Sequence, residues 1–306
     1  MNGVVIKSTG SWYQVRLENG TQMECRMKGK LRLDGIKHTN PVAVGDHVRV
    51  EPEPSKNSGL ITAIGERSNY IIRKSNNLSK QTQVIAANID QAMLVATLFM
   101  PRTSSGFIDR FLVTAEAYHI PVTLVFNKTD LYTEEANQLV DDYEKLYRSL
   151  GYGVLRTSVV NGSGIEDVKN LLQGKVTLIA GHSGVGKSSL INVINPTIAQ
   201  RTGVISAYSE KGMHTTTFAE MFELLPGSFI IDTPGIKDLG LVEINEQELS
   251  HYFPEMRSLL HSCRFNNCRH VNEPGCAVMQ ALESGQVDAE RYHNYLSMLR
   301  NEDDRH

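Results

Sequence analysis

The chain has 306 residues, of which 41% are hydrophobic, and this is enough for two or three domains with apolar cores. Its formal net charge of −3 excludes a protein that is basic throughout, so any contact with nucleic acid must come from a local basic surface. No apolar run reaches the roughly 18 residues of a membrane span, and residues 1–4 lack the basic start of a signal peptide, so a cytoplasmic protein with no membrane partner is expected.

The N-terminal part, residues 1–66, is predicted to form a small barrel of short strands. Apolar residues alternate along 13–17 and again along 23–27, on either side of an Asn19-Gly20 turn. Further strand faces are expected at 31–33, 48–50 and 61–64. This spacing predicts a five-stranded oligonucleotide-binding (OB) barrel.

Basic residues are concentrated between 26 and 49, where Lys28, Lys30 and Arg32 alternate with other residues. They can be the solvated face of an amphipathic sheet, which is the plainer interpretation. They can also be an RNA-binding face that follows phosphates, with Trp12 or Tyr13 available for stacking on bases. Both interpretations remain open from the sequence.

Residues 67–83 are polar and predict a linker, after which apolar strands alternate with helices. Strands are expected at 92–98, 122–126, 153–157 and 176–180, and helices at 107–118, 133–150, 165–172 and 188–194. This alternation predicts a doubly wound parallel sheet in an α/β domain over 67–240. Strands at 218–224 and 229–231 complete it, and the pattern from 245 onward predicts a mainly α-helical domain over 241–306.

A GxxxxGKS phosphate loop lies between the strand at 176–180 and the following helix. Its glycines let backbone N–H groups surround a triphosphate, Lys187 neutralises the β and γ oxygens, and the Ser188 hydroxyl ligates Mg²⁺. A chance Gly-rich turn is the alternative, which the strand–loop–helix context disfavours. The expected nucleotide-binding residues of this loop are Gly181, His182, Ser183, Gly184, Val185, Gly186, Lys187, Ser188 and Ser189.

A guanine-reading motif, Asn127-Lys128-Thr129-Asp130, follows the strand at 122–126. The Asp130 carboxylate would accept from guanine N1–H and the exocyclic amine, and Thr157-Ser158 after the next strand could offer a backbone N–H to guanine O6. Asn and Asp are also common as turn and capping residues. The position at the carboxyl end of a strand favours the binding role, so GTP or GDP is the expected ligand.

Two switch-like segments follow the phosphate loop. Asp232-Thr233-Pro234-Gly235 ends a strand as DxxG, where Asp232 would hold Mg²⁺ through water and the Gly235 N–H would sense the γ-phosphate. Of the threonines at 215–217, Thr216 is the expected Mg²⁺ ligand, although such a run also has plain β-propensity.

The order of these motifs differs from that of ordinary GTPases, which begin with the phosphate loop. Here the guanine motif comes first, which predicts a circularly permuted GTPase domain. Ile236 stands where many GTPases place a water-orienting glutamine, so His214 is the candidate replacement, with Thr216 and Lys187 as the other catalytic candidates. A His214 that merely packs in a loop is the open alternative.

Three thiols and an imidazole, Cys263, Cys268, His270 and Cys276, lie within fourteen residues near the C-terminus. They make a full tetrahedral set without an open position, which predicts one structural Zn²⁺. A disulfide would leave one of the three cysteines unpaired and is disfavoured in a reducing compartment.

Taken together, the motifs resemble the RsgA family (also called YjeQ or YloQ) of bacterial GTPases that depend on the small ribosomal subunit. The resemblance rests on the permuted GTPase motifs and the cysteine cluster, together with residues 28–32, 44–46, 86–91 and 273–275. It implies a factor that binds the immature small subunit and its rRNA late in maturation and is stimulated by the subunit; a monomer is expected. The family's switch histidine matches His214, preceded here by Met213 where a basic residue is usual.

A second hypothesis is an RNA-binding module that senses GTP, GDP or an alarmone and whose hydrolysis is incidental. A third hypothesis is a GTPase that acts on tRNA or at a membrane. The sequence contains no amphipathic anchor or extra catalytic cysteine that would support it.

Overall fold

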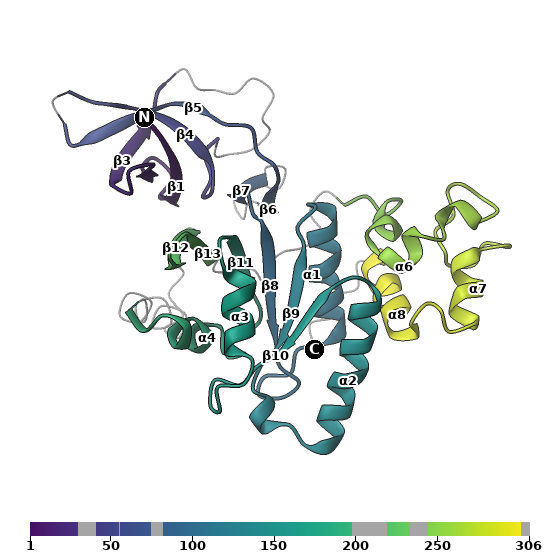
Figure 1. Ribbon diagram of the computed structural model, residues 1–306. Coiled ribbons are helices and arrows are strands. Elements are labelled where there is room, and N and C mark those ends of the chain that lie inside the picture. Colours follow the sequence, from purple (N-terminus) through teal and green to yellow (C-terminus); the bar gives the residue numbers. More distant parts are fainter. Residues whose placement is uncertain (30–40, 55, 75–81, 198–218, 233–243, 301–306) are drawn as a thin grey trace.

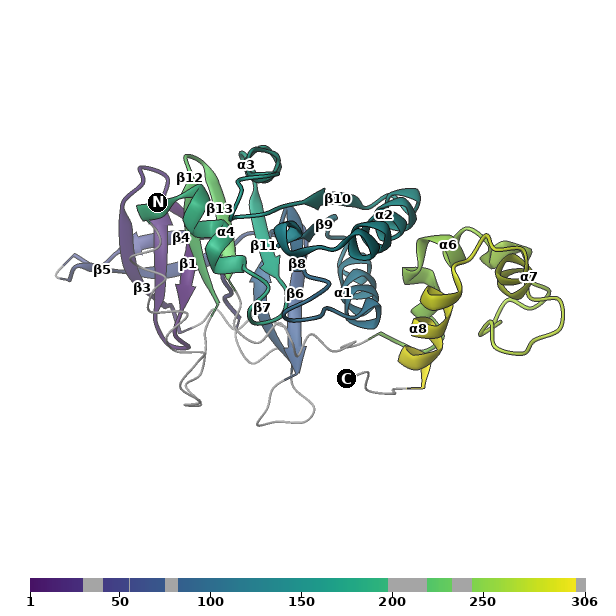
Figure 2. The ribbon, with the colours of Figure 1, turned by 90° about the horizontal axis from the view of Figure 1, so that it is seen from below.

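A computed structural model describes residues 1–29, 41–54, 56–74, 82–197, 219–232 and 244–300. Three parts follow one another along the molecule: an N-terminal barrel, a central sheet flanked by helices, and a C-terminal helical part (Figures 1 and 2). This confirms the predicted architecture. The expected boundaries after 66 and after 240 stay predictions, since the second lies outside the described residues.

Within its described residues the barrel has five strands, and their side chains alternate between the interior and solvent. They are β1 (Asn2–Ser8), β2 (Tyr13–Leu17), β3 (Gln22–Met27), β4 (His47–Pro52) and β5 (Ser58–Ile64). The order β1-β2-β3-β5-β4 closes through a β4–β1 pairing, as in an OB barrel. Val15, Cys25, Val50 and Ile61 fill the interior. The expected strand at 31–33 lies outside the described residues.

The segment predicted as a linker, 67–83, contains a first strand and the start of a second that pairs with it. β6 (Tyr70–Lys74) and β7 (Thr82–Ala87) form an antiparallel pair of their own. Polar neighbours in the sequence concealed the short apolar runs of these strands. The buried residues of the pair include Ile71, Ile72 and Val84. Before β6, Arg67 donates to both Asp46 oxygens at 2.7 Å, so this segment is fixed to the barrel.

Among the described residues, the central sheet is parallel over five strands, in the order β10-β9-β8-β11-β13, with β12 antiparallel at the end. The strands are β8 (Gln91–Ala96), β9 (Val122–Phe126), β10 (Gly153–Arg156), β11 (Val176–Ala180), β12 (Glu220–Leu225) and β13 (Ser228–Asp232). The doubly wound sheet is thus as predicted. β11 lies between β8 and β13, so the strand before the phosphate loop is central.

Helices cover both faces of this sheet, because successive strand residues point to opposite sides. α1 (Ser105–Ala117) and α2 (Glu134–Ser149) pack on the face that carries Leu94, Leu124 and Leu178. α3 (Ile165–Leu172) and α4 (Lys187–Ile194) pack on the face that carries Met93, Val125 and Ile179. Polar caps start α1 and α2, where Ser104 accepts from the Phe107 N–H and Thr133 from the Ala136 N–H.

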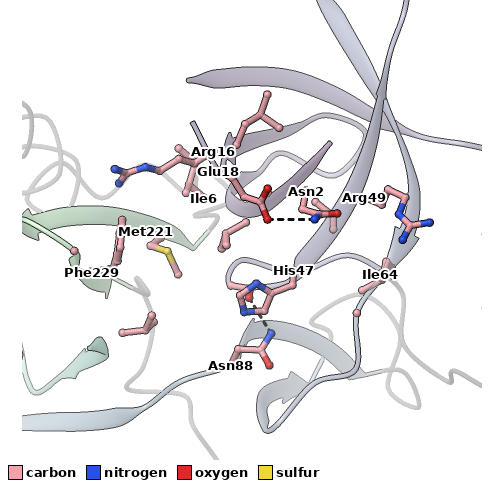
Figure 3. A pocket seen from close by; sticks show the side chains of 18 of the residues that line it. Asn2, Ile6, Arg16, Glu18, His47, Arg49, Ile64, Asn88, Met221 and Phe229 are labelled. Carbon is pink, nitrogen blue, oxygen red and sulfur yellow. Dashed lines mark hydrogen bonds between the residues drawn. The ribbon is translucent and has the colours of Figure 1, made fainter. Parts of the chain in front are cut away.

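The barrel adjoins the sheet at β12. Lys7 of β1 is paired with Glu220 in the strand ladder and by an ion pair of 3.0 Å, and Arg16 forms a 2.7 Å ion pair with Glu223. A cavity of about 780 Å³ opens at this junction, lined by residues of the barrel and of the β12–β13 hairpin, including Arg16, His47 and Phe229 (Figure 3).

The C-terminal part, within the described residues 244–300, is helical as predicted. It contains α6 (Pro254–Arg257), α7 (Ala277–Glu283) and α8 (Ala289–Leu299), with 3₁₀ turns η3 (Leu249–Tyr252) and η4 (Leu260–Ser262). Its apolar cluster includes Val113 of α1, and α8 packs against that helix (Figure 1).

Candidate nucleotide site and metal centre

The phosphate loop connects the end of β11 to the start of α4, and three of its glycines have positive φ. A Cβ on Gly181 would lie 2.2 Å from the Val95 carbonyl oxygen, and one on Gly186 would lie 2.3 Å from Asn127 Nδ2. Any side chain at either position would collide with a neighbouring strand end or its loop. Because it has glycine at these positions, the loop backbone can lie close to the neighbouring strand ends and to a ligand.

Lys187 Nζ donates to the carbonyl oxygens of Gly181 and His182 at 2.7 and 2.8 Å. The ammonium group therefore lies across the mouth of the loop, where phosphate oxygens would bind. Val185 is buried, whereas the side chains of Ser183, Ser188 and Ser189 are exposed at the loop and the first turn of α4. A hydroxyl at Ser188 is thus accessible to a ligand.

Asn127 joins the guanine motif to the phosphate loop. It is buried, its Nδ2 donates to the Val185 carbonyl oxygen at 2.9 Å, and its Oδ1 accepts from Thr157 Oγ1 at 2.9 Å. Three segments that are far apart in sequence therefore meet at one side chain. This is the arrangement expected when strand ends of a parallel sheet build one site.

The rest of the motif is held in the same way. Lys128 has a left-handed backbone (φ 62°), and its Nζ donates to the Met100 carbonyl oxygen at 2.5 Å. Thr129 donates to the Thr157 carbonyl oxygen, and Asp130 Oδ1 accepts from Ser158 Oγ at 2.5 Å. The sequence-predicted residues 127–130, 157–158 and 181–189 are therefore brought together at one edge of the sheet.

Asp232 is the last residue of β13, so the position of its backbone is known. It is the register partner of Ile179 on β11, two residues before Gly181, so the strand that leads into DxxG ends beside the phosphate loop. His214, Thr216 and Gly235 lie outside the described residues. Their expected roles stay predictions.

Sequence reasoning did not identify two residues that support this site. Tyr132 OH donates to the Asn127 carbonyl oxygen at 2.9 Å, and the Phe107 ring lies against the His182 ring with centroids 3.9 Å apart. The helix expected at 107–118 includes Phe107 without a role in the site, and Tyr132 lies just before the helix expected at 133–150. A tyrosine five residues after the Asn of a guanine motif is a weak local signal, and the Phe107 contact has none.

The Cys263, Cys268, His270 and Cys276 side chains converge in the C-terminal part, with one donor atom from each lying within 4.8 Å of the others. His270 Nδ1 is 3.6 Å from Cys263 Sγ and 3.4 Å from Cys276 Sγ, and all four cysteines of the chain are free. Burial lowers the pKa of His270, which favours the neutral imidazole that metals bind. The group can hold a metal ion.

The loop between these ligands is fixed by hydrogen bonds. Burial works against ionisation of Glu273, yet backbone N–H groups, including those of Arg269 and Val271 at 2.8 Å, lower its pKa to about 2. From α8, Tyr292 OH donates to the His270 carbonyl oxygen and Tyr295 OH to the Arg269 carbonyl oxygen. The ligand loop therefore has a defined shape.

The barrel's predicted RNA face is described only in part. Lys28 is exposed and lies 3.4 Å from Glu51, whereas Lys30 and Arg32 lie outside the described residues. The Arg26 guanidinium lies over the exposed Trp12 ring, 4.9 Å from its centroid. Among the described helices, none has the length and apolar character to cross a membrane.

Comparison with known proteins gives consistent matches along the chain. Residues 64–242 match the family described as RsgA GTPase, and residues 2–61 match the RsgA N-terminal domain. The small ribosomal subunit biogenesis GTPase RsgA of Porphyromonas gingivalis is 52% identical, over 99% of this chain and 97% of the relative. The protein of that name from Bacteroides fragilis is 50% identical, over 99% and 98%.

Two solved structures share the fold. The crystal structure of YjeQ from Thermotoga maritima has a TM-score of 0.79 and 36% identity, over 98% of this chain and 97% of that one. The structure of YloQ, described as a circularly permuted GTPase, has a TM-score of 0.74 and 31% identity, over 100% and 96%.

Proposed function

The chain belongs to the RsgA family of GTPases, and we propose that it acts in the late maturation of the small ribosomal subunit. It binds the subunit and its rRNA and hydrolyses GTP to GDP and phosphate with stimulation by the subunit, as a monomer in the cytoplasm. The observation that carries the nucleotide part is Asn127, which bonds to both the phosphate loop and Thr157. The subunit is inferred from the names of relatives at 50% and 52% identity.

In this proposal each half of the site binds one part of GTP. Asp130, which Ser158 orients, accepts from the guanine edge, and the residues 127–129 brace the base. The loop N–H groups and Lys187 hold the β and γ phosphates, so Lys187 exchanges its two carbonyl partners for phosphate oxygens. Ser188, Thr216 and Asp232 are the proposed Mg²⁺ ligands, and bound Mg²⁺ would neutralise charge on the phosphates.

Hydrolysis without the subunit is expected to be slow. Ile236 follows the DxxG sequence and cannot orient a water molecule, so His214 is the proposed replacement and Gly235 the proposed γ-phosphate sensor. Both are in the segments that join the phosphate loop and β13 to the rest of the chain. A bound subunit that positions His214 for the attacking water would raise the rate.

The metal is proposed to be one structural Zn²⁺. Zinc–sulfur bonds of about 2.3 Å and zinc–nitrogen bonds of about 2.0 Å at tetrahedral angles separate N from S by about 3.5 Å. The distances of 3.4 and 3.6 Å from His270 Nδ1 to two thiol sulfurs fit this geometry. Four protein donors leave no open position, so the ion supplies folding energy, not chemistry.

The barrel is the proposed rRNA-binding part, through Lys28, Lys30 and Arg32. Lys28 has an exposed carboxylate as its present partner. Such a pair is worth little in water, so a phosphate can replace Glu51 at small cost.

The decisive measurement is the GTP hydrolysis rate of the full chain with and without purified small ribosomal subunits. We expect strong stimulation by small subunits and none by large subunits, which serve as the control. Equal rates with and without small subunits would contradict the proposal and favour a nucleotide-sensing module whose hydrolysis is incidental.

The guanine assignment has its own test, Asp130→Asn. Loss of a charged acceptor should weaken GDP binding by about 10- to 100-fold and reduce the preference for guanine over adenine nucleotides. Asp167→Asn, an exposed carboxylate on α3, is the matched control and should bind GDP normally. Unchanged GDP affinity in Asp130→Asn would show that the base is read elsewhere.

A further inference from the structure

Phe107 contacts the part of the phosphate loop that Lys187 also holds. The rings of Phe107 and His182 are inclined by 31° with centroids 3.9 Å apart, so they are in van der Waals contact. His182 is the second residue of the loop, and its carbonyl oxygen accepts from Lys187 Nζ at 2.8 Å. Phe107 thus packs against the turn of the loop that carries this carbonyl.

The helix that carries Phe107 is fixed on both sides of that residue by α8. Two positions before it, Ser105 Oγ donates to Glu290 Oε1 at 2.5 Å. Two positions after it, the fully buried Asp109 accepts from Asn294 Nδ2 at 2.6 Å and pairs with the buried Arg291. The start of α1 therefore cannot shift without breaking contacts to the C-terminal part.

The same α8 holds the loop of metal ligands. Tyr292 and Tyr295 donate to the carbonyl oxygens of His270 and Arg269 at 2.7 and 2.6 Å. Direct contacts consequently run from the Cys₃His group through α8, Asp109 and α1 to the ring of His182. Every member of this series lies within the described residues.

We propose that Phe107 is a positioning residue of the phosphate site, through which the C-terminal metal-binding part holds the His182 turn of the phosphate loop ready for nucleotide. The inference rests on the proposed GTP site and adds to it. A loop whose N–H groups are already oriented loses less freedom when phosphate binds. The base half of the site is held by Thr157 and Ser158 and meets the phosphate loop at Val185, three residues beyond His182, so Phe107 acts on phosphate binding and leaves guanine selectivity unchanged.

The first test compares Phe107→Ala with Phe107→Tyr and the wild type as full-length, metal-loaded chains. Affinity for fluorescent GDP and the ratio of GDP to ADP affinity are measured, with circular dichroism to verify folding. Phe107→Ala should weaken GDP binding by about 3- to 10-fold, the range expected for one aromatic contact. Phe107→Tyr, which keeps the ring, should restore affinity to within about twofold of wild type, and the GDP-to-ADP ratio should stay constant throughout.

Leu139→Ala, an exposed truncation on α2, is the control for side-chain loss remote from the loop and should bind GDP as the wild type does. GDP affinity in Phe107→Ala equal to that of wild type would overturn the proposal. So would a loss of guanine preference in Phe107→Ala, because that result means general damage to the domain.

The second test removes the metal from the wild type and from Phe107→Ala with a chelator. Chelation should weaken GDP binding in the wild type and change it little in Phe107→Ala, since the contact that transmits the effect is already absent. An equal effect of chelation in both proteins, or in neither, would overturn the coupling. A wild type that binds no GDP would instead contradict the proposed function, so the two failures are distinguishable.

Discussion

The central domain is attached to its two neighbours by different kinds of interface. On the barrel side, Lys7–Glu220 and Arg16–Glu223 are ion pairs with side chains 29–41% exposed, and a cavity opens beside them. On the C-terminal side, the Arg291 side chain is 2% exposed and pairs with Asp109 and Glu255, which are 0% and 7% exposed. Phe253 and Tyr147 flank its guanidinium.

This difference matters because water screens the two ion pairs between the barrel and β12, whereas the Arg291 pairs are buried, as is the separate Arg67–Asp46 pair before β6. Exposed pairs contribute about 0–1 kcal/mol each and weaken with salt. Burial raises the pKa of Asp109 to about 6 even though Arg291 and the Asn294 and Tyr147 hydrogen bonds favour its charge, so this carboxylate depends on its partners. We therefore expect the contacts between the barrel and β12 to open more readily than those between the C-terminal part and α1.

Metal removal should have the largest effect, because it should destabilise the C-terminal part and leave the barrel side unchanged. Without the ion, the Cys₃His loop loses a binding free energy that in zinc-finger peptides is about 10–16 kcal/mol. The C-terminal part should unfold while GDP binding by the central domain remains measurable. Circular dichroism and limited proteolysis after chelation, followed by fluorescent GDP titration, check this; unchanged helix content would refute a structural role for the metal.

Arg291→Met should lower the free energy of unfolding by about 3–5 kcal/mol, because it leaves Asp109 and Glu255 as buried carboxylates without a cation. Urea unfolding provides the measurement. Arg257→Met, which removes a half-exposed partner of Glu116 at the same interface, is the control and should cost about 1 kcal/mol or less. Similar losses in the two variants would show that burial does not set the strength of the ion pairs at this interface.

Glu223→Gln on the barrel side should have the smallest effect, about 1 kcal/mol or less, because Arg16 keeps its contact with the Phe229 ring. The difference from wild type should shrink between low and high salt, as thermal unfolding in both buffers would reveal. Glu166→Gln, which removes an exposed pair with Lys169 on α3, separates a general charge effect from one at the interface. A salt-independent loss of several kcal/mol in Glu223→Gln would mean that the barrel is as firmly fixed as the C-terminal part.

The sequence was sufficient to predict the elements whose signals are local. The strand at 122–126 and the helix at 165–172 have the predicted bounds, and the motif residues gather at one sheet edge because the carboxyl ends of parallel strands meet there. β6 and β7 were missed because the polar residues of 67–83 concealed two short apolar runs, Ile71-Ile72 and 84–87, which belong to the paired strands. Phe107 with His182, and Asp109 with Arg291, are contacts between residues distant in sequence, which leave no periodic pattern.

The strand order also has a consequence for the order in which the chain is made. Among the strands of the central sheet, β8, β9 and β10 leave the ribosome first and can pair with one another, whereas β11, the other neighbour of β8, begins only at Val176. Until then one edge of β8, whose residues are all buried in the finished fold, has no partner and can pair with other chains. In this permuted sheet, the strands of the base-reading half are all synthesised before the phosphate loop. The loop follows β11, the strand that pairs with the free edge of β8.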